Sequence, residues 1–178
     1  MNYATIKDFD VANGPGVRVS LFVSGCRHYC KNCFNREAWD FNYGQPFTEK
    51  EIDHIIDAMK ADYIKGLSLL GGEPMEPANQ AGILPLVRKV KEAYPNKTIW
   101  CYTGYDFEKD IMEDMYLNNP DTKELVESFD IMVDGKFVEE LKNLSLRFRG
   151  SSNQRIIDVP ASLRAGEVVH WEYENSQE

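Results

Sequence analysis

Three of the four cysteines of this chain lie within one short segment, Cys26-Arg27-His28-Tyr29-Cys30-Lys31-Asn32-Cys33. Three residues separate the first two cysteines, and two residues separate the second from the third. Structural zinc sites and iron–sulfur clusters usually take four protein ligands, so this set lacks one member. An open metal position is where a small molecule can coordinate and react. The segment therefore indicates a reactive metal centre on a loop.

The residues alone leave three interpretations of this segment open. An iron–sulfur cluster is favoured over a zinc ion, and a zinc ion is favoured over reduced thiols without metal. The fourth ligand of a zinc ion could come from His28, His54 or Cys101. However, His28 lies inside the loop and is not expected to turn inward, and His54 is expected to be solvated. Cys101 is expected to be a buried core thiol, because free cysteine packs as a small hydrophobe.

The charge of the chain argues against several classes of partner. Its 178 residues include 20 Lys and Arg against 29 Asp and Glu, a formal net charge of −9. Nucleic-acid binding is not expected, since phosphate backbones attract basic surfaces. No apolar run approaches the roughly 20 residues that span a bilayer, and residues 1–8 lack the pattern of a signal peptide. We therefore expect a cytoplasmic protein without membrane contact, in which clustered cysteines indicate metal binding or catalysis.

The hydrophobic pattern predicts strands that alternate with helices. In residues 17–23, apolar side chains alternate with Arg18, Ser20 and Phe22, which is the period of a strand. Arg18 is expected either to bind an anion or to pair with a nearby carboxylate. The expected strands are 17–23, 66–70, 97–102, 129–133 and 155–159, and the expected helices are 48–61, 86–94, 106–117, 122–127 and 137–144. Such alternation is typical of parallel βαβ units. It predicts a single α/β domain over residues 1–178, with a frayed acidic tail over about 167–178.

Residues that can carry chemistry follow the predicted strands directly. The cysteine segment follows the first strand, and Gly71-Gly72-Glu73-Pro74 follows the second. Residues 102–105 and 134–136 follow the next two strands. Because the carboxyl ends of parallel strands meet at one edge of a sheet, we expect these loops to form one site. The paired glycines are expected to leave peptide N–H and C=O groups free to contact a ligand.

The order of these motifs resembles a known family. Cys-x3-Cys-x2-Cys followed by Gly71-Gly72-Glu73-Pro74 resembles the radical S-adenosylmethionine superfamily. The lead-in over residues 14–26, with its Gly-x-Gly-x-Arg run and Gly25 before Cys26, is similar to that of glycyl-radical activating enzymes. Residues 100–105, 133–137 and 149–154 resemble the branch that activates anaerobic ribonucleoside-triphosphate reductases. The resemblance covers roughly residues 5–160.

The resemblance implies a fold and a cofactor. The fold would be a partial (β/α) barrel of parallel strands with outer helices. Cys26, Cys30 and Cys33 would hold one [4Fe-4S] cluster and act in catalysis through it. The amino and carboxylate groups of S-adenosylmethionine, the cosubstrate, would chelate the fourth iron.

The resemblance also assigns contacts to the cosubstrate. Gly71, Gly72 and Glu73 would meet the methionine end through backbone groups, and Asp134 or Lys136 would meet the ribose or the carboxylate. The adenine would lie near Asn32, Cys33 and Phe34. Many superfamily members place an aromatic residue directly before the third cysteine, where this chain has Asn32, with Phe34 after the cysteine. Tyr102 and Thr103 are candidates for the lining of the pocket.

The reaction implied is that of a radical S-adenosylmethionine oxidoreductase. One electron would cleave S-adenosylmethionine to methionine and a 5′-deoxyadenosyl radical. That radical would remove a Cα hydrogen from a glycine of the large subunit of an anaerobic ribonucleoside-triphosphate reductase. A flavodoxin would be a suitable electron donor. Two alternatives stay open: an activator of another glycyl-radical enzyme, such as pyruvate formate-lyase, and a zinc-stabilised binding module without catalysis.

Overall fold

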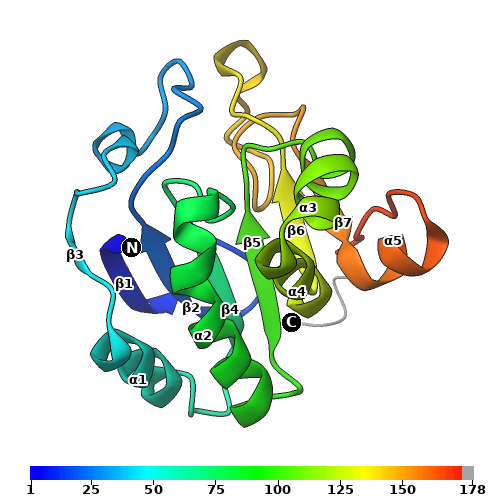
Figure 1. The fold of residues 1–178 in the computed structure, drawn as a ribbon. Helices are drawn as coiled ribbons and strands as arrows, with labels where there is room; N and C mark the ends of the chain where they lie inside the picture. Colours follow the sequence, from blue (N-terminus) through cyan, green and yellow to red (C-terminus); the bar gives the residue numbers. More distant parts are fainter. Residues whose placement is uncertain (174–178) are drawn as a thin grey trace.

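The structure is a computed structural model that describes residues 1–173, and it contains one mixed sheet of seven strands (Figure 1). The strand order across the sheet is β3-β1-β2-β4-β5-β6-β7. The strands are β1 (Asn2–Asp10), β2 (Val17–Val23), β3 (Gln45–Pro46), β4 (Ile64–Gly71), β5 (Thr98–Tyr102), β6 (Ile131–Asp134) and β7 (Arg155–Asp158). The helices are α1 (Glu49–Ala58), α2 (Pro77–Ala93), α3 (Tyr116–Asn118), α4 (Pro120–Ser128) and α5 (Val159–Ala165), with shorter or wider turns at η1 (Arg36–Trp39), η2 (Phe107–Met115) and η3 (Glu139–Leu141).

The centre of the sheet is parallel and its edges are antiparallel. Strands β2, β4, β5 and β6 run parallel, as the alternating pattern predicts. The expectation of parallel pairing is wrong for the last strand, since β7 pairs antiparallel with β6. The connection from β6 to β7 contains only the short turn η3, so no helix carries the chain back to the opposite end of the sheet. Strands β1 and β3 add an antiparallel edge on the other side, which was not predicted.

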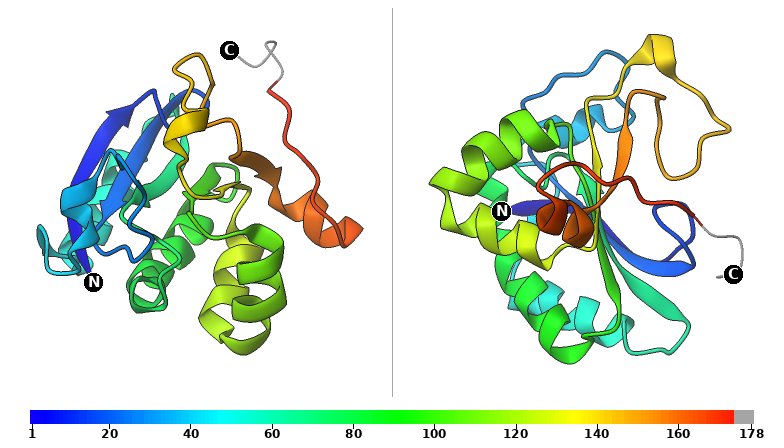
Figure 2. Two further views of the ribbon diagram at one scale, coloured as in Figure 1. Left: turned by 90° about the horizontal axis from the view of Figure 1, so that it is seen from above. Right: turned by 90° about the vertical axis from the view of Figure 1, so that its right-hand side faces the viewer.

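Helices α1, α2 and α4 cover one face of the sheet (Figure 2). The alternation in β2 decides which side chains meet them: Val19, Leu21 and Val23 are fully buried in the core on this face. Ile55 of α1 and Leu86 of α2 belong to the same core. The capping box at the start of α1 is present as predicted. Among the described residues, no helix is both long and apolar enough to cross a membrane.

Three of the predicted helices differ from the structure. Helix α2 begins at Pro77 rather than near Pro85, which instead lies inside the helix. Proline fits at the first helical position because it lacks a backbone N–H, and an N–H at that position would have no partner within the helix. The segment expected as a helix over 106–117 begins as the π-helical turn η2, in which the Ile111 N–H donates to the Asp106 carbonyl five residues back at 3.2 Å. In the segment 137–144, only Glu139–Leu141 is helical.

The other face of the sheet carries a buried arginine. Arg18 is fully buried and donates to Ser68 Oγ at 2.9 Å, to the Leu67 carbonyl at 3.0 Å and to Thr98. Neither expected role is seen, since all of these partners are neutral groups of the neighbouring strands. Burial lowers the pKa of Arg18 to about 10, which still leaves the guanidinium charged at neutral pH. The guanidinium also lies 5.7 Å from the ring centre of Trp100.

The end of the described chain packs on this same face rather than fraying from residue 167. The Trp171 N–H donates to the Ile156 carbonyl at 2.9 Å, and His170 forms a bridge with Ile157. The Trp171 ring meets the Trp100 ring edge-on at 5.1 Å. The tail was predicted to fray because of its acidic residues. Trp171 instead holds this segment against the sheet by burying apolar surface. Residues 174–178 of the predicted tail lie outside the described residues.

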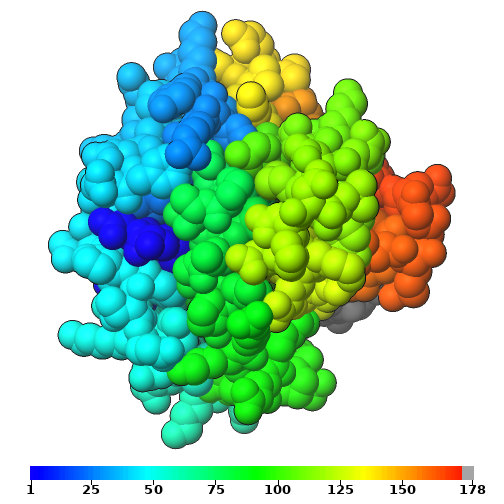
Figure 3. Space-filling view, viewed as in Figure 1, coloured from blue at the N-terminus to red at the C-terminus, as the bar shows by residue number. Residues whose placement is uncertain are grey.

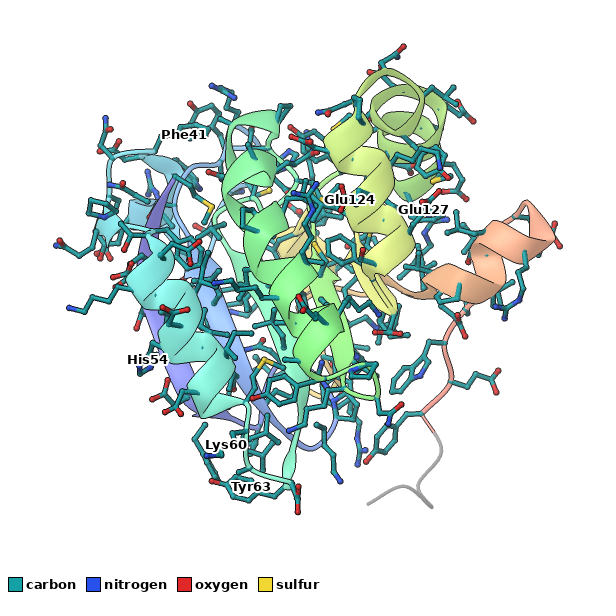
Figure 4. The ribbon with its side chains drawn as sticks, turned by 60° about the horizontal axis from the view of Figure 1, so that its bottom comes forward. Phe41, His54, Lys60, Tyr63, Glu124 and Glu127 are labelled. Atoms are coloured by element: carbon teal, nitrogen blue, oxygen red, sulfur yellow. The ribbon has the colours of Figure 1, made fainter. Side chains whose placement is uncertain are left out.

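We expect Arg18→Ala to destabilise the fold by about 3 kcal/mol or more, because it removes four hydrogen bonds to Ser68, Leu67 and Thr98 at a buried site. Urea unfolding followed by circular dichroism measures the change. Arg88→Ala is the matched control and should change stability little, since Arg88 pairs with Glu124 (labelled in Figure 4) and both side chains are exposed. Equal effects of the two substitutions would contradict this prediction.

Candidate functional site

The cysteine loop leaves the end of β2 at Gly25, a position where any other residue would be strained. Gly25 has a φ of +102°, and a Cβ there would lie 2.2 Å from a ring carbon of Phe41. The Gly25 N–H donates to the Ala38 carbonyl at 2.7 Å, and the Cys26 N–H donates to the Trp39 carbonyl at 3.2 Å. These bonds tie the first cysteine to the segment that follows the loop.

The backbone of the loop explains why an asparagine precedes the third cysteine. Asn32 has a φ of +56°, in the left-handed region that asparagine enters more readily than bulky residues do. The Cys33 N–H then donates to the Cys30 carbonyl at 3.1 Å and closes a tight turn. Asn32 is therefore well suited to the backbone of this loop, and it is exposed.

All three cysteines line one open cavity of about 470 Å³. Its volume lies in the range of small-molecule sites. The other lining residues come from the ends of four parallel strands, from β1 and from the segment between β6 and β7; they include Lys7, Phe22, Phe34, Trp39, Leu70, Gly71, Gly72, Glu73, Tyr102, Thr103, Gly104, Val133, Gly135, Phe137, Phe148, Arg149 and Gln154. The structure brings all four predicted strand-end loops to this cavity, since Gly135 of the fourth loop also lines it.

Two loops lie side by side above the helices, as the space-filling view shows (Figure 3). One is the cysteine loop, and the other begins after β6. The rings of Phe34 and Phe137 join them at 5.0 Å, and the ammonium group of Lys142 lies 5.2 Å from the Phe34 ring centre. Phe34 is 65% exposed and lines the cavity, so much of its side chain is open to solvent there.

The three thiols fit a metal cluster by their placement and chemistry. Burial raises the pKa of Cys26 to about 12 and also raises that of Cys30. The backbone N–H of Phe137 and the ammonium of Lys136 oppose the rise at Cys30. Thiolates are the metal-binding form, so cations at this site would offset the cost of deprotonating these buried groups. Cys101 is the expected core thiol, fully buried among the residues between sheet and helices.

The glycine turn after β4 is not free in the way that the sequence suggests. The Gly72 N–H donates to the Val23 carbonyl at 2.7 Å, and the Glu73 N–H donates to the Gly25 carbonyl at 2.8 Å. The expectation that these two N–H groups await a ligand is therefore wrong. A Cβ on Gly72 would lie 2.7 Å from the Gly25 carbonyl oxygen, so the glycine permits close contact with the cysteine loop.

The carboxylate of Glu73 is buried and accepts four hydrogen bonds from the protein. Its Oε1 accepts from Thr103 Oγ1 at 2.9 Å and from the Gly104 N–H at 2.6 Å, and lies 2.7 Å from His28 Nε2. Its Oε2 accepts from the Met75 N–H at 2.8 Å. The expectation that His28 points away from the site is wrong, because its ring turns inward to this carboxylate. The sequence carries no signal for this pair, since 45 residues separate its members.

The loop after β6 departs from the expected arrangement. Asp134 is 2% exposed and bound by Arg155, whose Nε and Nη2 donate to it at 3.0 and 2.6 Å, and by the Phe107 N–H at 2.8 Å. Neither Asp134 nor Lys136 is among the described residues that line the cavity, and the same holds for Asn32. Arg155 also pairs with Glu108, so this acidic group is a structural ion-pair network.

Two polar groups without a partner within residues 1–173 lie at the cavity, one on Tyr102, an expected lining residue, and one on Trp39, which was not predicted. The Tyr102 hydroxyl and the Trp39 indole N–H are buried, and neither has a hydrogen-bond partner among the described residues. Both residues line the cavity. The position of Tyr102 at a strand end is the only sequence signal for this role, and Trp39 has none.

In the reduced protein without metal, we expect alkylation to divide the four cysteines into two classes. Cys26 and Cys101 should react at least about tenfold more slowly with iodoacetamide at pH 8 than Cys30 and Cys33. The first two are buried, which shields them from the reagent and disfavours the thiolate, whereas Cys30 and Cys33 are partly exposed. Peptide mapping by mass spectrometry measures the four rates. Rapid alkylation of Cys101 would contradict its placement in the core.

Comparison with known proteins agrees with this site. A family described as a 4Fe-4S single cluster domain matches residues 12–157. The anaerobic ribonucleoside-triphosphate reductase-activating protein of Escherichia coli K12 is 44% identical over 156 residues, covering 86% of this chain and 96% of that protein. The proteins of the same name from Vibrio cholerae and phage T4 are 44% and 42% identical, each covering 88% of this chain, and 97% and 93% of their own lengths. The chain therefore belongs to the family of anaerobic ribonucleoside-triphosphate reductase-activating proteins.

Proposed function

We propose that this chain is a radical S-adenosylmethionine enzyme that generates a glycyl radical on an anaerobic ribonucleoside-triphosphate reductase. One observation carries the proposal: three thiols spaced as Cys-x3-Cys-x2-Cys open into one cavity beside a Gly-Gly-Glu turn. Membership of a family named for activating this reductase supports the choice of partner. The sheet has four parallel strands at its centre, which is in keeping with a partial barrel around the cavity.

The cofactor supplies the hard chemistry in such an enzyme. A reduced [4Fe-4S] cluster held by Cys26, Cys30 and Cys33 would give one electron to the sulfonium of S-adenosylmethionine, which breaks into methionine and a 5′-deoxyadenosyl radical. That radical would take a hydrogen atom from the Cα of a partner glycine, giving 5′-deoxyadenosine and the glycyl radical. An external donor, such as a flavodoxin, would supply the electron.

The residues of the chain would hold the cosubstrate and keep water out. Gly71 and Gly72 edge the cavity and would meet the methionine end, through groups other than the Gly72 N–H. Phe34 offers an exposed ring at the cavity edge for the adenine. The Tyr102 hydroxyl is a better candidate for a polar contact to the ribose or carboxylate than Asp134, whose oxygens are already bound.

Two other functions are weaker. Activation of a different glycyl-radical enzyme, such as pyruvate formate-lyase, uses the same site, but the similar proteins are named for the ribonucleotide reductase. A zinc-stabilised binding module would require a fourth protein ligand. His28 is engaged by Glu73, and Cys101 is buried in the core away from the cavity.

We expect the anaerobically reconstituted protein to be brown, with iron and acid-labile sulfide bound, and to form 5′-deoxyadenosine when given reductant and S-adenosylmethionine. Cys30→Ala should lower that product to background, since it removes a proposed cluster ligand. Cys101→Ala is the matched control and should keep it. Chromatography of the reaction mixture measures the product. A colourless protein with one zinc ion, or full activity of Cys30→Ala, would refute the proposal.

We also expect the choice of partner to be visible in a direct activation assay. The reconstituted protein, mixed with a large anaerobic ribonucleotide reductase subunit from the same source, should produce the doublet of a glycyl radical in electron paramagnetic resonance. A pyruvate formate-lyase from that source should give no more than about a tenth of this signal, because we propose that the enzyme prefers the ribonucleotide reductase as its partner. The reverse ratio would favour the alternative partner.

A further inference from the structure

We propose that His28 is a positioning residue, which fixes the cysteine loop by docking onto the buried carboxylate of Glu73. The proposal rests on the proposed function only in taking the three thiols as cluster ligands. His28 lies two residues after Cys26 and two residues before Cys30. Whatever fixes its ring therefore fixes the part of the loop that presents both thiols.

The contact between His28 and Glu73 is short and shielded from water. His28 Nε2 lies 2.7 Å from Glu73 Oε1, and the two side chains are 9% and 1% exposed. Both oxygens of the carboxylate have further donors from Met75, Thr103 and Gly104. These bonds hold the carboxylate in place, so it can serve as a fixed point for the loop.

The ring of His28 is also confined by its neighbours. Tyr105 meets it edge-on, with ring centres 4.5 Å apart. A Cβ built on Gly104 would lie 2.6 Å from a carbon of the His28 ring, so any side chain there would displace it. The loop after β5 therefore leaves room for the His28 ring. It is a different loop from the one that carries the cysteines.

Other side chains between the first and third cysteines also contact the rest of the protein. Arg27 Nη1 donates to the buried Glu76 carboxylate at 2.6 Å, and the Tyr29 ring meets the Trp39 ring edge-on at 5.1 Å. Arg27, Tyr29, Lys31 and Asn32 are exposed. Tyr29 and Asn32 also have positive φ angles, which few residues adopt without a cost. Groups that orient metal ligands from outside the ligand set commonly decide how well a metal site holds together. We assign this role to His28 because its side chain is 9% exposed, whereas that of Arg27, the other loop residue that pairs with a buried carboxylate, is 62% exposed.

The test begins with the full-length, reduced protein without cluster, and follows hydrogen–deuterium exchange of residues 26–34. His28→Ala should speed exchange in this segment about tenfold, which corresponds to about 1.4 kcal/mol. His28→Gln should restore slow exchange, because its amide can donate to the same Glu73 oxygen. Gly104→Ala should reproduce the effect of His28→Ala from a different loop, and it keeps the test decisive if His28→Ala does not fold.

His54→Ala is the matched control. His54 makes a contact of the same length, 2.7 Å from its Nε2 to Asp8 Oδ1, but lies exposed on α1 (Figure 4). Its replacement should leave exchange in residues 26–34 unchanged. If removing a histidine only destabilised the protein, His28→Ala and His54→Ala would change the exchange of residues 26–34 to the same extent.

The second measurement uses the reconstituted protein and its content of iron and acid-labile sulfide during incubation with a chelator. His28→Ala should lose iron several times faster than the unaltered protein, with His28→Gln close to the unaltered rate. Unchanged exchange and unchanged iron loss in His28→Ala, or a His28→Gln as defective as His28→Ala, would overturn the proposal. Exchange requires neither cluster nor S-adenosylmethionine. Absence of 5′-deoxyadenosine from the unaltered protein would thus refute the proposed function and leave this test intact.

Discussion

The buried carboxylate of Glu73 is the interaction on which the arrangement of the site depends. A charged group out of contact with water is costly unless hydrogen bonds satisfy it, and here the donors come from loops after β2, β4 and β5. The carboxylate is satisfied only when the three loops converge. The same convergence brings the cysteine loop against the glycine turn, where the Gly72 and Glu73 N–H groups bond to Val23 and Gly25.

The parallel centre of the sheet makes this convergence possible. Strands β2, β4 and β5 end at one edge because α1 and α2 return the chain to the opposite end each time. Side chains then divide by face. Val19 and Leu21 of β2 enter the core under the helices, while Phe22 lines the cavity and Arg18 bonds across to β4 and β5. The face opposite the helices thus combines a cavity with a buried cation.

Much of the site could be predicted because it is local in sequence. The cysteine spacing, the strand before it and the glycine turn after β4 are short patterns, and the structure gathers them as strand-end geometry requires. The role of Asp134 could not be predicted this way, since its partner Arg155 comes from the antiparallel strand β7. A strand end identifies where a carboxylate lies, but not whether another residue already occupies it.

By itself, the sequence determined the α/β pattern, the three-cysteine loop and the resemblance that placed the chain in its family. These depend on residue type and spacing along the chain. Only the tertiary structure decided that His28 turns inward, that Asn32 serves the backbone, and that the N–H groups of Gly72 and Glu73 are already bonded. Each of these depends on hydrogen bonding or steric contact between segments that are distant in sequence, or on a backbone angle that residue spacing does not encode.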